Sequence, residues 1–520
     1  MEKISPILLE VFKNKFASIA EEMGTVLQKT AFSSNIKERR DFSCAIFTED
    51  GDMIAQAAHI PVHLGSMPMS VKTVIKTLDM KEGDIAILND PFKGGTHLPD
   101  ITMVAPFFYD GELLFYAANR AHHADIGGVS PGSMPISTSI FEEGLIIPPV
   151  KVVEKGKVNQ QILELIKNNV RTPEEREGDF NAQIAACNLG IKRLKELFDK
   201  NEKEKVLNYS RYLLDYTEKM VRQFIKTLPD GEYTFEDLLE DDGRGATDIK
   251  ISLTIEKKDD KLTFDFSKSD PQVAGSVNAV YAITLSAVFY VLVSLLDENI
   301  PINAGALRPV KVITKKGTIV DATFPAGVAA GNVETSQRLV DVILGAFSYI
   351  LPEEVPAASQ GTMNNITVGG INPKTGKPFS YYETIGGGMG ASAKTDGESA
   401  IQSHMTNTLN TPIEALEFEY PFMVHQYKIR KNSGGNGLNK GGDGIIREYE
   451  FLTDVKLTVI SERRKLAPYG LFGGEPGKSG ENIVITNGKS KNMPSKFSIE
   501  LKKGDRLIVK TPGGGGFGKS

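Results

Sequence analysis

Histidine, the side chain best suited to hold a borderline metal ion near neutral pH, is concentrated in one part of this chain. Five of the seven histidines lie between residues 59 and 123. Three of them stand in two short, acidic and glycine-rich phrases, 89–100 (NDPFKGGTHLPD) and 119–128 (NRAHHADIGG). Imidazole nitrogens and carboxylate oxygens, without sulfur, form open catalytic sites for Zn²⁺, Mn²⁺ or Fe²⁺. The two phrases therefore predict a metal centre.

A predicted hairpin brings the two phrases together. Residues 101–109 and 112–118 are β-rich runs joined by Asp110-Gly111, a strong hairpin signal. His97 and Asp100 enter the first run and His122 leaves the second. Both phrases therefore return to the same end of the hairpin, where residues far apart in sequence can share one ion.

The competing interpretation is that these residues only make hydrogen bonds in glycine-rich turns. That interpretation explains the pair His97 and Asp100 taken alone. It does not explain why His122-His123-x-Asp125 reaches the same hairpin end, or why acidic Glu38 and Asp41 precede the first strand. Neighbouring side chains point to opposite sides of an extended backbone, so we expect only one of His122 and His123 to be a ligand. His59 and His63 fit a structural role at least as well.

Apolar periodicity elsewhere predicts a mixed α+β, multi-domain protein. The expected helices cover 5–31, 66–79, much of 159–227, 277–297 and 333–351. Strands are expected at 42–47, 53–57, 84–88 and within 231–268, which includes a hairpin at Asp259-Asp260. From residue 360 onward, short strands alternate with glycine clusters. We divide the chain into an α+β metal-binding region (1–230), a central α/β region with a buried helix (231–360) and a glycine-rich, β-rich region (361–520).

Composition excludes several classes of function. The formal charge of −6 and the lack of a basic stripe argue against a nucleic-acid partner. Only Cys44 and Cys187 are present, so no disulfide framework is expected, and Cys44 is assigned to packing. The uncharged stretch 279–296 contains three serine or threonine side chains and two tyrosines and has no basic flank, which favours a buried helix over a membrane span. Without a secretory signal at the N-terminus, a cytoplasmic location is expected.

The end of the sequence imitates a nucleotide-binding motif. Residues 513–520 (GGGGFGKS) match the P-loop pattern letter for letter. A P-loop needs a helix after the lysine, whose N-terminus holds the phosphate, and the sequence stops at Ser520. We therefore expect no ATP binding by this chain.

Several phrases together resemble the hydantoinase B/oxoprolinase family. They run in order along nearly the whole chain: 38–44 (ERRDFSC), 61–68 (PVHLGSMP), 89–101 (NDPFKGGTHLPDI), 120–128 (RAHHADIGG), 331–337 (GNVETSQ), 383–390 (ETIGGGMG), 461–464 (SERR) and the run from 511 to 516. The resemblance implies a B-type subunit that works with an A-type partner, an ATPase of actin-like fold that phosphorylates the substrate carbonyl. It also implies a hetero-oligomer in which this chain alone has no ATPase activity.

The resemblance further implies a divalent metal, Zn²⁺ or Mn²⁺ with Fe²⁺ as the alternative, bound by Glu38, His97, Asp100 and His122. Asp41 is the alternative to Glu38. In the expected mechanism the ion activates water, and Asp125 or His123 orients that water or carries its proton.

Three functions follow from the resemblance as alternatives. The first is ATP-dependent hydrolysis of a cyclic amide, which the length of 520 residues favours because carboxylase chains of this type tend to be longer. The second is carboxylation of a ketone such as acetone or acetophenone, as the alpha-type subunit. The third is a non-catalytic scaffold for the partner ATPase, which would have no need for an intact ligand set.

Overall fold

A seven-stranded antiparallel sheet carries both histidine phrases. The computed structural model describes residues 4–57 and 60–519. The sheet has the order β2-β1-β5-β4-β3-β6-β7. Its strands are β1 (Phe42–Thr48), β2 (Met53–Gln56), β3 (Ile85–Leu88), β4 (Asp100–Tyr109), β5 (Glu112–His122), β6 (Val150–Glu154) and β7 (Lys157–Val158). The hairpin predicted at Asp110-Gly111 is confirmed as β4–β5, in the middle of the sheet.

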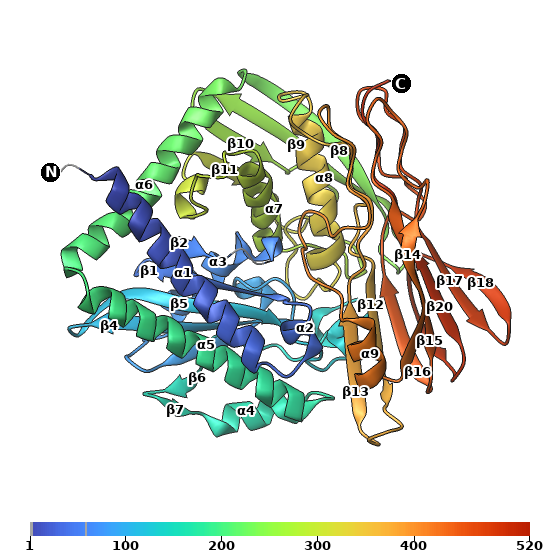
Figure 1. Cartoon of the computed structure of the whole chain (residues 1–520), viewed down its shortest axis with the longest axis horizontal. Coiled ribbons are helices and arrows are strands. Elements are labelled where there is room, and N and C mark those ends of the chain that lie inside the picture. Colours follow the sequence, from blue (N-terminus) through green and yellow to red (C-terminus); the bar gives the residue numbers. More distant parts are fainter. Residues whose placement is uncertain (1–3, 58–59, 520) are drawn as a thin grey trace.

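Long helices cover one face of this sheet. Figure 1 shows α1 (Pro6–Thr30) and α5 (Pro173–Asp199) running side by side across it, with α6 (Lys203–Thr227) next in the chain. Ser5 caps α1 through its side chain and Pro6 occupies the first turn, as the sequence predicts. The apolar stripe that includes Phe12, Phe16 and Met23 packs against the sheet, so the predicted amphipathic helix is confirmed. The shorter α2 (Ser34–Lys37), α3 (Ser66–Thr77) and α4 (Gln160–Lys167) complete this region.

The opposite face of the sheet shares one hydrophobic core with the central region. That region contains α7 (Tyr281–Ser294), α8 (Ser336–Phe347) and a four-stranded sheet of order β11-β10-β9-β8. The strands are β8 (Gly231–Asp241), β9 (Thr247–Lys258), β10 (Lys261–Asp265) and β11 (Val310–Ile313). The stretch tested for membrane insertion is α7, which lies buried in this core. Among the residues described, no helix combines the length and apolar character needed to cross a bilayer.

The C-terminal region contains two further sheets around their own core. The first, β13-β12-β16-β19, comprises β12 (Asn365–Ile371), β13 (Pro378–Glu383), β16 (Val455–Ile460) and β19 (Lys496–Leu501). The second, β14-β15-β20-β17-β18, comprises β14 (Phe422–Arg430), β15 (Gly444–Phe451), β17 (Glu481–Thr486), β18 (Lys489–Met493) and β20 (Arg506–Lys510). The helix α9 (Ile413–Glu419) precedes β14. The mixed α+β, multi-domain fold expected from the sequence is confirmed.

The glycine clusters pack backbone against backbone. A Cβ added to Gly441 would lie 2.0 Å from the carbonyl oxygen of Gly514, and one added to Gly515 would lie 1.9 Å from that of Tyr469. All four amides of 513–516 donate to backbone carbonyls, namely those of Lys478, Gly442, Ala358 and Glu475. These amides are not available to cradle a phosphate, so the P-loop-like letters encode a structural contact.

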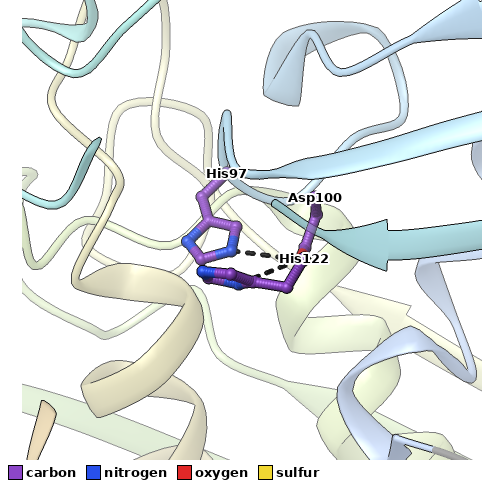
Figure 2. A group of neighbouring side chains, drawn as sticks. All are labelled: His97, Asp100 and His122. Atoms are coloured by element: carbon purple, nitrogen blue, oxygen red, sulfur yellow. Dashed lines mark ion pairs between the residues drawn. The ribbon is translucent and has the colours of Figure 1, made fainter. Parts of the chain in front are cut away.

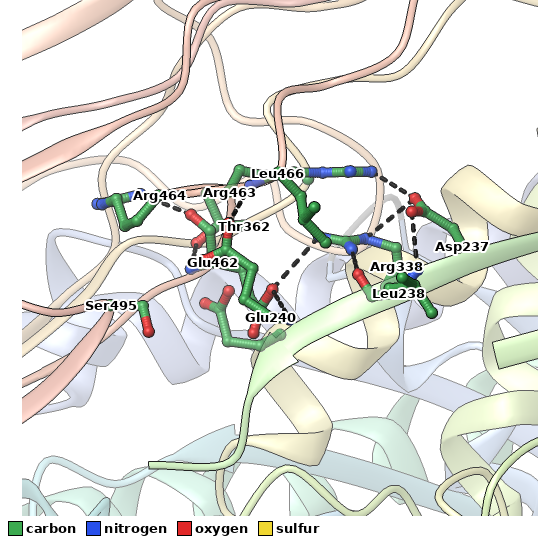
Figure 3. A network of polar contacts seen from close by, with 12 residues as sticks. Asp237, Leu238, Glu240, Arg338, Thr362, Glu462, Arg463, Arg464, Leu466 and Ser495 are labelled. Atoms are coloured by element: carbon green, nitrogen blue, oxygen red, sulfur yellow. Dashed lines mark hydrogen bonds and ion pairs between the residues drawn. The ribbon is translucent and has the colours of Figure 1, made fainter. Parts of the chain in front are cut away.

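A buried network of charges joins the central and C-terminal regions (Figure 3). Arg463 donates to Asp237 of β8 at 2.6 Å and to Asp341 of α8 at 3.1 Å. Glu462 receives Lys496 at 2.6 Å and lies 3.5 Å from Arg338 of α8. Because buried charges must be paired, this network fixes the position of α8, which follows the π-helical turn Gly331–Thr335 that contacts His97.

Candidate metal centre

The antiparallel ladder of β4 and β5 sets Asp100 directly opposite His122. His97 lies three residues before Asp100, in the turn that enters β4, and its carbonyl accepts the amide of Asp100 at 3.2 Å. The amide of His122 donates to the carbonyl of Asp41 at 3.0 Å, which fixes β5 to the residue before β1. Figure 2 shows the side chains of His97, Asp100 and His122 converging at this end of the hairpin.

The three side chains form a compact group of potential ligands. His97 Nε2 lies 3.2 Å from Asp100 Oδ1, and His122 Nδ1 lies 3.4 Å from the same oxygen. One ligand atom from each residue lies within 4.8 Å of the other two, and all three residues are buried. Ligands at about 2.0–2.1 Å from a tetrahedral ion stand about 3.3 Å apart, which matches the two shorter separations. The residues present therefore fit a cation such as Zn²⁺.

The protonation states suit a cation site. The Nδ1–H group of His97 donates to the carbonyl of Ala329 at 3.3 Å, so Nε2 is the nitrogen of this ring that faces the group. Burial lowers the pKa of His122 and outweighs the attraction of Asp100 and Asp41, so its ring is neutral at neutral pH. Burial alone would raise the pKa of Asp100, but the surrounding histidines hold that pKa well below its usual value. The group therefore offers one carboxylate, the neutral imidazole of His122 and the Nε2 atom of His97.

Four further residues reach the same place, lining a cavity of about 20 Å³ beside Asp100 and His122: Asp41, His63, Asn332 and Tyr382. His63 Nε2 lies 3.5 Å from Asp100 Oδ2, and its Nδ1 lies 2.8 Å from Ser43 Oγ. The Tyr382 ring stacks on His122 with centroids 4.5 Å apart. From the sequence, His63 fitted a structural role at least as well as a functional one, and neither Asn332 nor Tyr382 was identified as a site residue. For His63 the available signal was its place within the histidine cluster.

Glu38 is not part of the ligand group found among the described residues. It caps the C-terminal end of α2 as a half-buried residue, and its charge adds to burial in raising the pKa of Glu419. Asp41 instead lines the cavity, and its charge acts on both His63 and His122. Of the two acids considered before the first strand, the structure brings Asp41 to the site. His59 lies outside the described residues.

His123 and Asp125 are not brought into the group either. His123 Nε2 lies 2.9 Å from Gln183 Oε1, and its ring packs against Phe180 at 4.8 Å. Burial lowers the pKa of His123 to about 4. Asp125 accepts the amides of Gly127, Gly132 and Arg171 and pairs with the Arg171 guanidinium at 2.9 Å. The alternation of β5 sends His122 and His123 to different neighbours, and Asp125 holds the glycine turn that follows.

Glu143 holds the backbone segment that positions His97. Its Oε1 accepts the amides of Val328 and Ala329, and Ala329 is the residue whose carbonyl holds His97. Burial raises the pKa of Glu143 to about 7. This carboxyl is therefore protonated in the folded protein at pH values where it ionises in the unfolded chain.

Changing Glu143 to glutamine tests this difference in the metal-free protein. A raised folded-state pKa means that the wild type loses unfolding free energy as pH rises from about 4.5 to about 7, and the glutamine does not titrate. The unfolding free energy of Glu143→Gln minus that of wild type should therefore be about 1–3 kcal/mol larger at pH 8 than at pH 5, measured by urea unfolding. The neighbouring Glu142→Gln is the control and should show no such gain. An unchanged difference at the two pH values contradicts the assignment.

Comparison with known proteins identifies the family of this chain. The sequence model of the hydantoinase B/oxoprolinase family matches residues 5–520. The chain belongs to this family. It is 42% identical to a 5-oxoprolinase of Dictyostelium discoideum over 99% of its own length, and it spans 40% of that longer protein. The family assignment made from the quoted phrases is thereby confirmed.

Two solved structures share the fold of this family member. The ATP-dependent caprolactamase of Pseudomonas jessenii superposes with a TM-score of 0.93 at 30% identity, covering all of this chain and 92% of the other. An acetone carboxylase superposes with a TM-score of 0.90 at 20% identity, covering 99% of this chain and 76% of the other. The second likeness shows a common fold only.

Proposed function

We propose that this chain is the metal-bearing B-type subunit of an ATP-dependent cyclic amide hydrolase. The observation that carries the proposal is the convergence of His97, Asp100 and His122 into one buried group at the end of the β4–β5 hairpin. The fold shared with an ATP-dependent caprolactamase at 30% identity supports amide hydrolysis as the reaction class. We further propose Zn²⁺ or Mn²⁺ as the ion and Asp41, in place of Glu38, as the nearby acid.

Two subunits would divide the chemistry. We propose that an A-type partner binds ATP and phosphorylates the amide oxygen, because the amides of the terminal glycine run are already bonded within this chain. The 5-oxoprolinase relative is a longer protein, of which this sequence covers two fifths. Phosphorylation makes the carbonyl carbon a better electrophile, and ring opening would then take place on this subunit.

The side chains around the group have distinct tasks in this proposal. His97, Asp100 and His122 would hold a divalent cation, and its chemistry there would be to lower the pKa of water toward neutrality. Asp100 provides the negative charge of the ligand set, and the hydrogen bond from His97 to Ala329 fixes that ring and its tautomer. Tyr382 holds His122 by stacking. His63, oriented by Ser43, faces Asp100 through Nε2 and is the group placed to receive a proton. Burial of the group excludes bulk water.

The test is to co-express the chain with an A-type partner and to measure ADP release with a panel of substrates. The panel contains 5-oxoproline, a hydantoin, caprolactam, and acetone with bicarbonate. We expect ATP turnover that depends on one of the cyclic amides and on a divalent cation. Turnover stimulated only by the ketone with bicarbonate would establish the carboxylase alternative instead. Full turnover by a His97→Ala complex would favour the scaffold.

A further inference from the structure

Asn332 is a buried amide aimed at the candidate ligand group from another part of the fold. It lies in the π-helical turn Gly331–Thr335 that leads into α8, and only 4% of the residue is exposed. The backbone of this turn packs directly against a neighbouring segment, because a Cβ on Gly331 would lie 1.9 Å from the carbonyl oxygen of Asn278. Single π-helical turns are rare and occur often at functional sites.

The two ends of the Asn332 amide are in different situations. Nδ2 lies 3.1 Å from His97 Nε2 and 3.5 Å from Asp100 Oδ2. Oδ1 is buried and has no hydrogen-bond partner within the part of the chain that the structure describes. A buried carbonyl oxygen without a hydrogen-bond partner is destabilising, so Oδ1 is an acceptor that remains to be satisfied.

A cation cannot coexist with this orientation of the amide. The Nδ1–H of His97 is committed to Ala329, so Nε2 is the nitrogen that would bind the ion. Once its lone pair is donated, Nε2 no longer accepts from Asn332, and the N–H groups would direct their positive ends at the cation. A half-turn of the carboxamide exchanges oxygen and nitrogen without moving a neighbour, because the two ends are nearly equal in size.

We propose that Asn332 is a ligand of the cation and presents Oδ1 to it from the position that Nδ2 occupies in the structure. The inference rests on the proposed function. The separation of 3.1 Å from His97 Nε2 is close to the spacing of about 3.3 Å between ligands of a tetrahedral ion, and the same amide lies 3.5 Å from Oδ2 of Asp100, the second oxygen of the ligand carboxylate.

Cation affinity, measured on the purified full chain, tests the role of Asn332. Metal-free wild type, Asn332→Ala and Asn332→Asp are titrated with Mn²⁺ and Zn²⁺ in competition with a chelator, and Co²⁺ absorption reports the ligand set. We expect Asn332→Ala to weaken binding about 10- to 100-fold and to change the Co²⁺ spectrum. Asn332→Asp keeps an oxygen in place and should bind at least as tightly as wild type. Asn119→Ala, a buried asparagine of β5 that faces Gln183, is the matched control and should bind like wild type.

The sign of the effect separates the alternatives. If the amide only donates to His97 in the metal-free protein, removing it frees Nε2, and Asn332→Ala binds the cation as tightly as wild type or tighter. That result overturns the inference. If thermal unfolding shows that Asn332→Ala is not folded, Asn332→Leu removes both polar atoms at similar volume and takes its place. Failure of wild type to bind any of the three cations overturns the proposed function together with this inference, whereas unchanged binding by the variant overturns the inference alone.

Discussion

Replacing Asp100 with asparagine is expected to remove the bound cation and at least about 100-fold of the substrate-dependent ATP turnover. Asp100 is the only member of the described ligand group that carries a negative charge, and both other members reach its Oδ1 within 3.4 Å. Asparagine keeps the shape but removes that charge. The measurements are metal content per chain by mass spectrometry and ADP release by the complex with the partner.

The matched control is Asp125→Asn. Asp125 is also fully buried and follows the same strand, but its oxygens hold backbone amides and Arg171. We expect this variant to lose stability and to keep its cation. If Asp125→Asn instead loses turnover while retaining both cation and fold, the catalytic role expected from the sequence for Asp125 is correct. Stoichiometric cation and full turnover in Asp100→Asn would contradict the assigned site.

A single methyl group in the glycine bundle is expected to prevent folding. In Gly514→Ala the new Cβ would lie 2.0 Å from the carbonyl oxygen of Met389, which is far closer than atoms can approach. The neighbouring backbone cannot move aside, because Gly514 also exchanges hydrogen bonds with Gly442 and Gly435. We expect a loss of more than about 4 kcal/mol in unfolding free energy, measured by chemical denaturation, or no soluble protein.

Gly376→Ala separates steric contact from backbone conformation. Gly376 lies in the turn between β12 and β13 with a φ of +68° and nothing within 4 Å of its added Cβ. Its substitution should cost only the conformational strain of about 1–2 kcal/mol. Equal losses in the two variants would show that conformational freedom, and not close packing of the backbone, explains the glycine clusters.

Much of the fold could be predicted because its signals are local. The cap at Ser5-Pro6, the apolar stripe of α1 and the turn at Asp110-Gly111 each depend on neighbouring residues, and each predicted element is present. The glycine clusters were visible too, but the sequence could not tell a tight turn from a contact between two backbones. That distinction depends on partners such as Gly441 and Gly514, which are far apart in the chain.

The residues of the candidate site also fall into those placed by local sequence signals and those placed only by the tertiary structure. The sequence by itself determined that His97, Asp100 and His122 meet, because an antiparallel hairpin must return its second strand to the start of its first. Only the tertiary structure decided that Asp41 and not Glu38 faces the group, that His123 turns to Gln183, and that Asn332 reaches His97 across 235 residues. Pairing within a hairpin is fixed by short-range geometry. The approach of α8 is fixed by burial and paired charges distributed over the whole chain, which no local pattern records.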